Sequence, residues 1–233
     1  MALEIRAGRP SALSTLWRST IGKKVAMATT GVIMIGFVVF HMAGNLKVFT
    51  GAAHFNAYSH WLRTIGEPAL PHEGFLWIMR VVLVASVVVH IVAAERLTHR
   101  ALHQRPRKHS KKSLLGRNYV AFTMRSGGVI LALFVVWHIL DLTALVVNAR
   151  GQSGHPYQNL VAGFSLWYPN VIYLVAMLAL GFHLWHGIWS AATTLGVRSR
   201  RHRAVKLLAA ALSIVVTVGF AAVPVAVMTG MVS

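Results

Sequence analysis

The sequence contains no cysteine. Disulfides, thiolate zinc sites and cysteine-ligated iron–sulfur clusters are therefore excluded from this chain. Acidic side chains are also scarce, because 5 Asp and Glu residues stand against 23 Lys and Arg residues, for a formal charge of +18. Yet 56% of the residues are hydrophobic and the mean hydropathy is +0.60. A soluble basic protein would not be so apolar, so we expect a membrane protein with cationic loops and no nucleic-acid partner.

Five apolar blocks are long enough for a helix to span a bilayer, which takes roughly 20 residues. They cover residues 25–46, 74–95, 126–147, 170–195 and 205–230. The first block is long enough to span and lacks a convincing cleavage site, so we expect no cleaved signal peptide. The sequence thus predicts an all-α membrane protein, a single domain over residues 1–233 built as a five-helix bundle with little outside the helices.

Lysine and arginine fall mostly on one side of these blocks. Five precede the first block, nine lie from Arg96 to Arg125, and five lie from Arg198 to Lys206. The other side receives Lys47, Arg63, Arg80 and Arg150. The positive-inside rule then predicts a cytoplasmic N-terminus and an outer C-terminus. The run "RPRKHSKK" (Arg105–Lys112) is expected to be an inner loop that touches anionic lipid or docks an acidic partner surface.

Histidines occur at membrane depth, where ionisable residues are costly and usually functional. Those within the predicted spans are His41, His90, His138, His183 and His186. Neutral imidazole binds haem iron, and four helices with facing histidines can hold two bis-histidine haems. A histidine proton relay and simple polar packing remain open alternatives. His183 and His186 share a helix face, so their spacing does not choose between them.

Depth along the helices suggests how the histidines pair. At about 1.5 Å per residue, His41 and His138 lie on the order of 6–15 Å below the outer helix ends, whereas His90 and His183 lie roughly 20–24 Å below them. The sequence therefore predicts a His41/His138 pair and a His90/His183 pair, stacked across the membrane.

The segments around these histidines carry a family resemblance. They include "STIGKKVAMATTGVIMIGFVVFHMAGNL", "NAYSHWLRTIGEPALP", "LWIMRVVLVASVVVHI", "MRSGGVILALFVVWHILD" and "FHLWHGIWSAATTLG". Together they cover nearly the whole chain and resemble the dihaem cytochrome b membrane anchors of succinate:quinone oxidoreductases (succinate dehydrogenases and fumarate reductases). In that family the axial ligands lie on the first four helices, and the predicted fifth helix here contains no histidine.

The resemblance implies a ligand set. Matched by position, His41 and His138 correspond to the ligands of the outer haem, and His90 and His183 to those of the inner haem. The match selects His183 because the family ligand directly follows the Phe182 position. His186 is then expected to bond a haem propionate or a neighbouring helix, or merely to pack.

The resemblance also implies a division of labour among subunits. A flavoprotein subunit oxidises succinate at FAD, and an iron–sulfur subunit on the cytoplasmic face passes electrons to this chain. Two haems b then carry the electrons to a quinone, for which menaquinone is expected, in a bacterial cytoplasmic membrane. No succinate-oxidising site is expected on this chain. Its oligomeric state, including a higher oligomer, is open.

Rival functions also remain open. One is the fumarate reductase direction, although some fumarate-reducing relatives carry a glutamate just before the histidine on helix four. Here Leu180, Gly181 and Phe182 precede His183, which favours succinate oxidation. Others are a dihaem anchor of another quinone-linked dehydrogenase and a proton-coupled transporter.

Charged residues near the histidines are further candidates. Arg80 is expected to pair with an outer-haem propionate, or to be an interfacial charge. Asp141, one turn beyond His138, is expected to protonate the quinone or to bond locally, or to be an interfacial charge. Arg125 resembles a family arginine near the inner propionates, against an ordinary positive-inside charge. Weaker candidates, with the two carboxylates expected to be solvated, are Arg18, Ser19, Lys24, Glu67 and Glu73.

Overall fold

The computed structural model describes residues 17–103, 111–148, 150–197 and 202–233, and within these ranges it contains helices and no strand. Within the described residues five helices are long and apolar enough to cross a membrane, which confirms the predicted all-helical chain with five spanning helices. Their spans are Thr20–Thr50, Gly74–His103, Ala121–Thr143, Trp167–Thr194 and Arg203–Met228. Arg6, Arg9 and residues 105–110 of the basic run lie outside the described residues.

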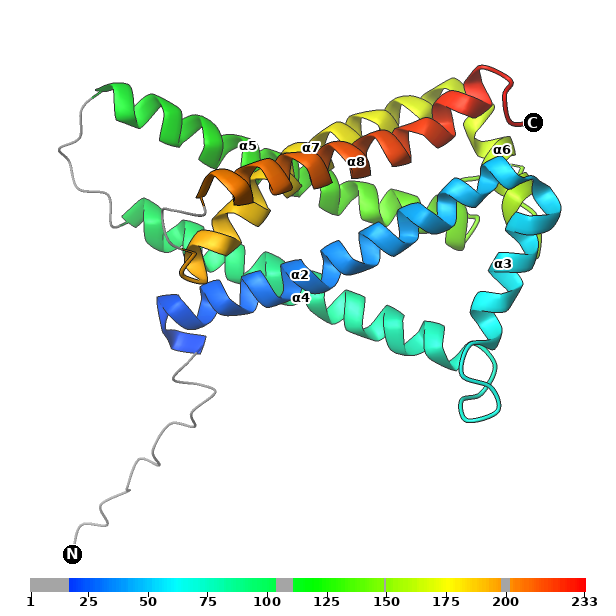
Figure 1. Ribbon diagram of the computed structural model, residues 1–233, viewed down its shortest axis with the longest axis horizontal. Coiled ribbons are helices and arrows are strands. Elements are labelled where there is room, and N and C mark those ends of the chain that lie inside the picture. The colour runs from blue at the N-terminus through cyan, green and yellow to red at the C-terminus, as the bar shows by residue number, and fades with distance from the viewer. Residues whose placement is uncertain (1–16, 104–110, 149, 198–201) are drawn as a thin grey trace, which may run out of the picture.

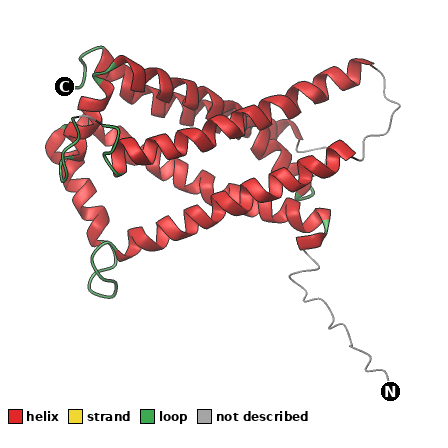
Figure 2. Cartoon of the chain, turned by 180° about the vertical axis from the view of Figure 1, so that it is seen from behind, coloured by secondary structure: helices red, strands yellow, loops and turns green. Residues whose placement is uncertain are grey.

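The long helices form two packed groups (Figures 1 and 2). In the first group α2 (Thr20–Asn45) packs along α4 (Gly74–His103). In the second, α7 (Trp167–Thr194) packs against both α5 (Lys111–His138) and α8 (His202–Met228). Contacts of α2 with α7 and α8 join the groups. Many large apolar side chains on the outer surfaces are exposed, as expected of helices that face lipid.

The two ends of the bundle differ. One end holds the start of α2, the end of α4 and the starts of α5 and α8, and we call it the basic end (Figure 1). Its described cations include Lys24, Arg96, Arg100, Arg203 and Lys206. The opposite end, the capped end, is covered by α3 (Ala52–Thr64) and α6 (Pro156–Phe164).

Neither α3 nor α6 was expected from the sequence, which predicted little outside the spanning helices. Gly51, with a φ of 91°, turns the chain between the 3-10 helix η1 (Leu46–Thr50) and α3. Pro156 opens α6, where its missing N–H costs nothing. Asn56 ties the two helices together, because its Oδ1 accepts from the Tyr157 N–H at 3.1 Å. Short helices of mixed polarity give no long apolar block, so hydropathy alone did not reveal them.

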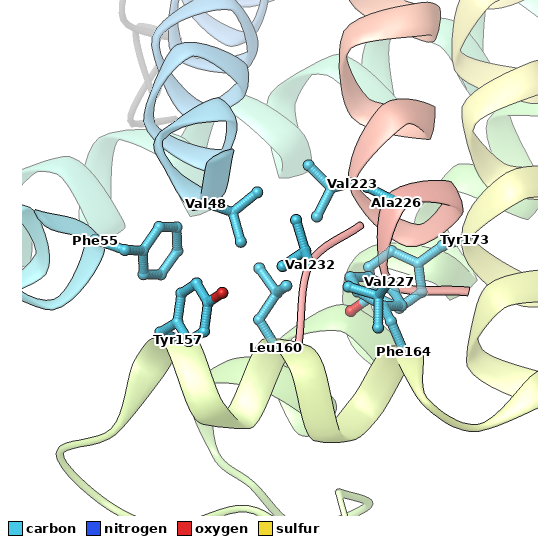
Figure 3. Close-up of a cluster of buried hydrophobic side chains, with 10 residues drawn as sticks. All are labelled: Val48, Phe55, Tyr157, Leu160, Phe164, Tyr173, Val223, Ala226, Val227 and Val232. Carbon is cyan, nitrogen blue, oxygen red and sulfur yellow. The ribbon is translucent and has the colours of Figure 1, made fainter. Parts of the chain in front are cut away.

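A buried apolar cluster lies beneath these short helices (Figure 3). Its members come from η1, α3, α6, α7, α8 and the C-terminal segment, and they are Val48, Phe55, Tyr157, Leu160, Phe164, Tyr173, Val223, Ala226, Val227 and Val232. The cluster fixes the capped end against α7 and α8. It thereby holds Tyr173 in a defined place beside the end of α5.

A second cluster joins α2, α7 and α8 through Met42, Leu184 and Val216. Gly219 permits this approach, because a Cβ at that position would overlap the Met42 sulfur. Helix α8 carries no histidine in its described spanning part and acts as a scaffold for the helices that do.

The third spanning helix differs most from its predicted bounds of 126–147. Helix α5 begins at Lys111, its α-helical part ends at His138, and a π-helical turn, η2 (Ile139–Thr143), follows. A π turn accommodates an extra residue per turn and so changes the direction in which side chains point. Asp141 lies in this turn and is 3% exposed.

Candidate functional site

Four histidines from four helices meet as two pairs. The rings of His41 on α2 and His138 on α5 have centroids 5.8 Å apart and planes at 82°. The rings of His90 on α4 and His183 on α7 have centroids 6.2 Å apart and planes at 57°. We call these the outer pair, nearer the capped end, and the inner pair, nearer the basic end. They are the pairs that the depth of the residues predicts, and each joins one helix group to the other.

The spacing of both pairs suits a shared metal. Metal–nitrogen bonds of about 2 Å on opposite sides of one metal place two imidazole centroids about 6 Å apart. The described residues contain no group of three or more histidine, cysteine or acidic side chains that could hold a bare ion. Each pair would offer a metal two histidine nitrogens.

The outer pair is supported by a buried polar chain. The Tyr173 hydroxyl donates to Asp141 Oδ2 at 2.9 Å, and its oxygen lies 3.1 Å from His138 Nδ1. A phenol has one proton, so with that proton given to the carboxylate, the oxygen accepts from the His138 Nδ1–H. The lone pair of His138 is then on Nε2. Both Tyr173 and Asp141 are buried, at 6% and 3% exposure.

Aromatic packing fixes the middle member of this chain. The Tyr173 ring meets Phe134 and Phe164 edge-on, with centroids 5.0 and 4.8 Å apart. Such edge-to-face contacts favour one ring orientation. The hydroxyl is therefore held toward α5, where the π turn presents Asp141.

The inner pair is supported by neutral groups. His90 Nδ1 lies 3.1 Å from the Met27 carbonyl and 3.3 Å from Thr30 Oγ1. The Thr30 hydroxyl donates to the Ala26 carbonyl at 2.8 Å, so it too accepts from His90. Gly31 lies beside the ring, because a Cβ there would meet His90 Cε1 at 3.6 Å, an ordinary contact. His90 is thus also held with its proton on Nδ1 and its lone pair on Nε2.

The partner rings are held differently. His41 stacks on Phe37, with centroids 5.1 Å apart and planes at 15°, and it also meets Phe220 at 5.9 Å. The buried Nδ1 of His183 has no hydrogen-bond partner among the described residues. Each pair therefore contains one histidine whose Nδ1–H donates a hydrogen bond: His138 in the outer pair and His90 in the inner pair.

His186 lies outside both pairs. Its Nδ1 donates to the Phe182 carbonyl of its own helix at 3.0 Å, and its ring packs against Trp185 at 4.8 Å. The contact across to α4 is made by His183 instead. Of the two histidines, His183 is therefore the one that faces His90. That it ligates a haem stays a prediction.

Comparison with known proteins points to one relative. The chain is 26% identical to the succinate dehydrogenase cytochrome b558 subunit of Bacillus subtilis (strain 168) over 170 residues, which are 72% of this chain and 76% of that protein. The chain is thus similar to a cytochrome b subunit of a succinate dehydrogenase. No family model matches it, and no solved structure matches it. The relationship confirms the resemblance drawn from the histidine-bearing segments.

The predicted cationic partners of the cofactor occupy peripheral positions. Arg80 lies 3.7 Å from Glu73 Oε2, and its guanidinium lies 4.7 Å from the centroid of the Trp77 ring. Arg125 is exposed on α5. Their contacts with a haem propionate stay predictions.

The expected solvated carboxylates of the capped end have partners. Glu73 accepts from Arg63 at 3.1 Å, and Glu67 pairs with His72 at 3.0 Å. Exposed pairs of this kind contribute little stability. They position the loop before α4.

The weaker candidates at the basic end have structural contacts. Ser19 caps α2, because its Oγ accepts from the Gly22 N–H at 2.8 Å. The Arg18 carbonyl accepts from Arg100 at 2.8 Å, which ties α4 to the start of α2. Lys24 is exposed.

An open pocket lies at the capped end. It has a volume of about 580 Å³ and is lined by Lys47, His54, Ala57, Tyr58 and Trp61. The Lys47 ammonium lies 5.1 Å from the centroid of the Tyr58 ring, which stacks on Trp61 at 5.8 Å. The pocket thus combines an aromatic wall with hydrogen-bond donors.

Several residues of the site were missed in the sequence. Tyr173, Thr30 and Gly31 support the paired histidines but form no motif with them. For Tyr173 and Thr30 the available signal was a hydroxyl within an apolar block, whereas Gly31 gave none. The partner of each hydroxyl depends on which helices are neighbours, and that information is absent from the spacing of residues along one helix.

Proposed function

We propose that this chain is the cytochrome b anchor of a succinate dehydrogenase and that it holds two haems b. The outer pair, His41 and His138, ligates one haem, and the inner pair, His90 and His183, ligates the other. The chain passes electrons from an iron–sulfur subunit to a membrane quinone. The observation that carries this proposal is the meeting of four histidines from four helices as two pairs with centroids 5.8 and 6.2 Å apart.

The donor set fits haem b. A haem b would take two nitrogen ligands from the protein, and each pair would supply them. In His138 and His90 the Nδ1 proton is committed to a hydrogen bond, which leaves Nε2 free to ligate. The relative is by name a cytochrome b558, which agrees with this donor set.

Bound haem would supply one-electron redox chemistry. The residues of this chain orient the two ligand pairs and surround them with apolar side chains. Phe37 and Phe220 flank His41, and Phe134 lies 5.7 Å from His138. An apolar shell of this kind limits solvent access and so tunes the potential. Arg80 and Arg125 remain proposed partners of haem propionates.

The basic end is proposed to face the cytoplasm, following the positive-inside rule. Its cations would receive an iron–sulfur subunit, which in turn carries a flavoprotein with FAD. The clusters belong to that partner, because this chain contains no cysteine. The chain would therefore lie in a bacterial cytoplasmic membrane and act as a subunit, with succinate chemistry elsewhere in the complex.

The quinone is proposed to bind toward the capped end, with menaquinone as the expected type. The pocket there offers Lys47, His54 and Tyr58 as donors to quinone carbonyls and Trp61 as a stacking surface. Asp141 is buried and bonded to Tyr173, so a part in quinone protonation would proceed through its neighbours.

The haem content of the purified complex tests the proposal. We expect two low-spin haems b per copy of this chain in a pyridine haemochrome assay. A flavoprotein and an iron–sulfur subunit should co-purify with it and reduce quinone with electrons from succinate. One haem or none would contradict the dihaem assignment, and succinate oxidation by the chain alone would contradict the division of labour.

A further inference from the structure

The two paired histidines with a hydrogen-bonded Nδ1, His138 and His90, differ in their hydrogen-bond partners. His138 bonds to the Tyr173 hydroxyl, which bonds to the Asp141 carboxylate. His90 bonds to a backbone carbonyl and to a threonine hydroxyl, both of them neutral. Only the outer pair is thus connected to an acidic group among the hydrogen bonds found in the described residues.

We propose that Tyr173 is a positioning residue for the outer site: it holds His138 with its proton on Nδ1 and connects the ring to the carboxylate of Asp141, which lowers the reduction potential of the haem bound there. This inference rests on the proposed function, because it requires a haem on His41 and His138. Tyr173 touches the ligand and acts through it.

The physical reason lies in the direction of the two hydrogen bonds. Tyr173 donates toward the carboxylate and accepts from the imidazole, so electron density is shifted toward the His138 ring. A ligand that donates to an acceptor through its second nitrogen becomes a more basic ligand. A more electron-rich imidazole stabilises the ferric state relative to the ferrous state. Burial strengthens the effect, since hydrogen bonds in series polarise one another more in a low dielectric.

The packing makes the connection specific. Tyr173 is wedged between Phe134 and Phe164, and its ring is part of the cluster at the capped end. Asp141 reaches the hydroxyl because the π turn η2 directs it inward. Removing the hydroxyl alone would leave this packing in place while breaking both hydrogen bonds.

The test is a redox titration of the whole complex, followed at the haem absorption bands. The outer haem is identified as the one that disappears in His41→Ala. In Tyr173→Phe we expect both haems to be retained, the midpoint potential of the outer haem to rise, and that of the inner haem to stay unchanged. Tyr168→Phe is the matched control, because it removes a hydroxyl from the same helix. The ring of Tyr168 packs on Trp137. This control should move neither potential.

Asp141→Asn separates charge from packing. It preserves the size of the side chain and an oxygen that can accept from Tyr173, so the outer potential should rise here too. The double variant should shift the potential no further than Tyr173→Phe alone, because the carboxylate acts only through the hydroxyl. Additive shifts would show that Asp141 acts independently and would overturn the connection.

The outcomes distinguish this inference from the proposed function. Two haems with an unmoved outer potential in both single variants would overturn the role of Tyr173 and leave the dihaem assignment intact. Equal shifts at both haems would overturn it as well, since the connection reaches only one. If Tyr173→Phe lost haem, Asp141→Asn, which keeps the hydroxyl, would decide by its potential. Absence of two haems from the unaltered complex would contradict the proposed function itself.

Discussion

The outer and inner histidine pairs are alike in spacing and different in support. Their centroid distances are 5.8 and 6.2 Å, but the ring planes meet at 82° in the outer pair and at 57° in the inner pair. His138 is hydrogen-bonded to a tyrosine, which is bonded to a buried carboxylate, whereas His90 is hydrogen-bonded to a carbonyl and a threonine. The comparison teaches that two histidine pairs of similar spacing can be given different electronic surroundings by the groups that orient their rings.

Loss of one ligand should give the largest effect and shows whether the two sites are separate. We expect His183→Ala to reduce the haem content from two to one per chain, because the inner pair loses a ligand that faces His90. The pyridine haemochrome assay measures the content, and low-temperature EPR identifies the remaining bis-histidine signal.

His186→Ala is the control for that variant. Its ring bonds only within its own helix, so both haems should be retained, with at most a shifted potential. If His186→Ala lost the inner haem and His183→Ala kept it, the ligand would be His186 and the inner pair would be misassigned.

A bulky residue beside His90 should disturb the inner pair alone. In Gly31→Ala the new Cβ would meet His90 Cε1 at 3.6 Å, an ordinary contact, so we expect both haems to be retained. In Gly31→Leu the longer side chain would displace the ring, because helix packing leaves it little room. The inner haem should then be lost or weakly bound while the outer spectrum is unchanged. Equal haem content in the two variants would contradict the close approach of α2 to His90.

The smallest effect is expected from the threonine of the inner pair. Thr30→Val removes one neutral acceptor at 3.3 Å from His90 Nδ1, but the Met27 carbonyl at 3.1 Å remains. A neutral hydrogen bond contributes about 0.5–1.5 kcal/mol, and here the loss is only partial. The inner midpoint potential should therefore move less than the outer one moves in Tyr173→Phe. A larger shift in Thr30→Val would reverse the contrast between the pairs.

Much of the candidate site was predictable because the four paired histidines lie on long helices, where position sets depth. A rise of about 1.5 Å per residue converts position into depth, and depth alone placed His41 opposite His138 and His90 opposite His183. The same geometry did not choose between His183 and His186, which are separated by less than one turn. The choice between them depended on family resemblance. In the structure His183 is the one whose ring faces His90, and its role as a haem ligand stays a prediction.

The supporting residues were not predictable in this way. Tyr173 and Asp141 lie on different elements and meet only because α5 packs along α7 and ends in a π turn. Likewise α3 and α6 contain no long apolar block, although their side chains help to build the core at the capped end. A pattern along one helix carries no information about the rotation of its neighbour.

The sequence by itself determined that this protein has five apolar helices, cations concentrated at alternate connections, and histidines at two depths on four of the helices. These properties follow from the cost of placing polar groups in a bilayer, which acts on each residue separately. Only the tertiary structure decided which groups form hydrogen bonds with the histidines. Hydrogen bonds at 2.9 to 3.3 Å depend on the relative rotation and approach of packed helices. Packing at Gly31, Phe134 and Phe164 sets this rotation and approach.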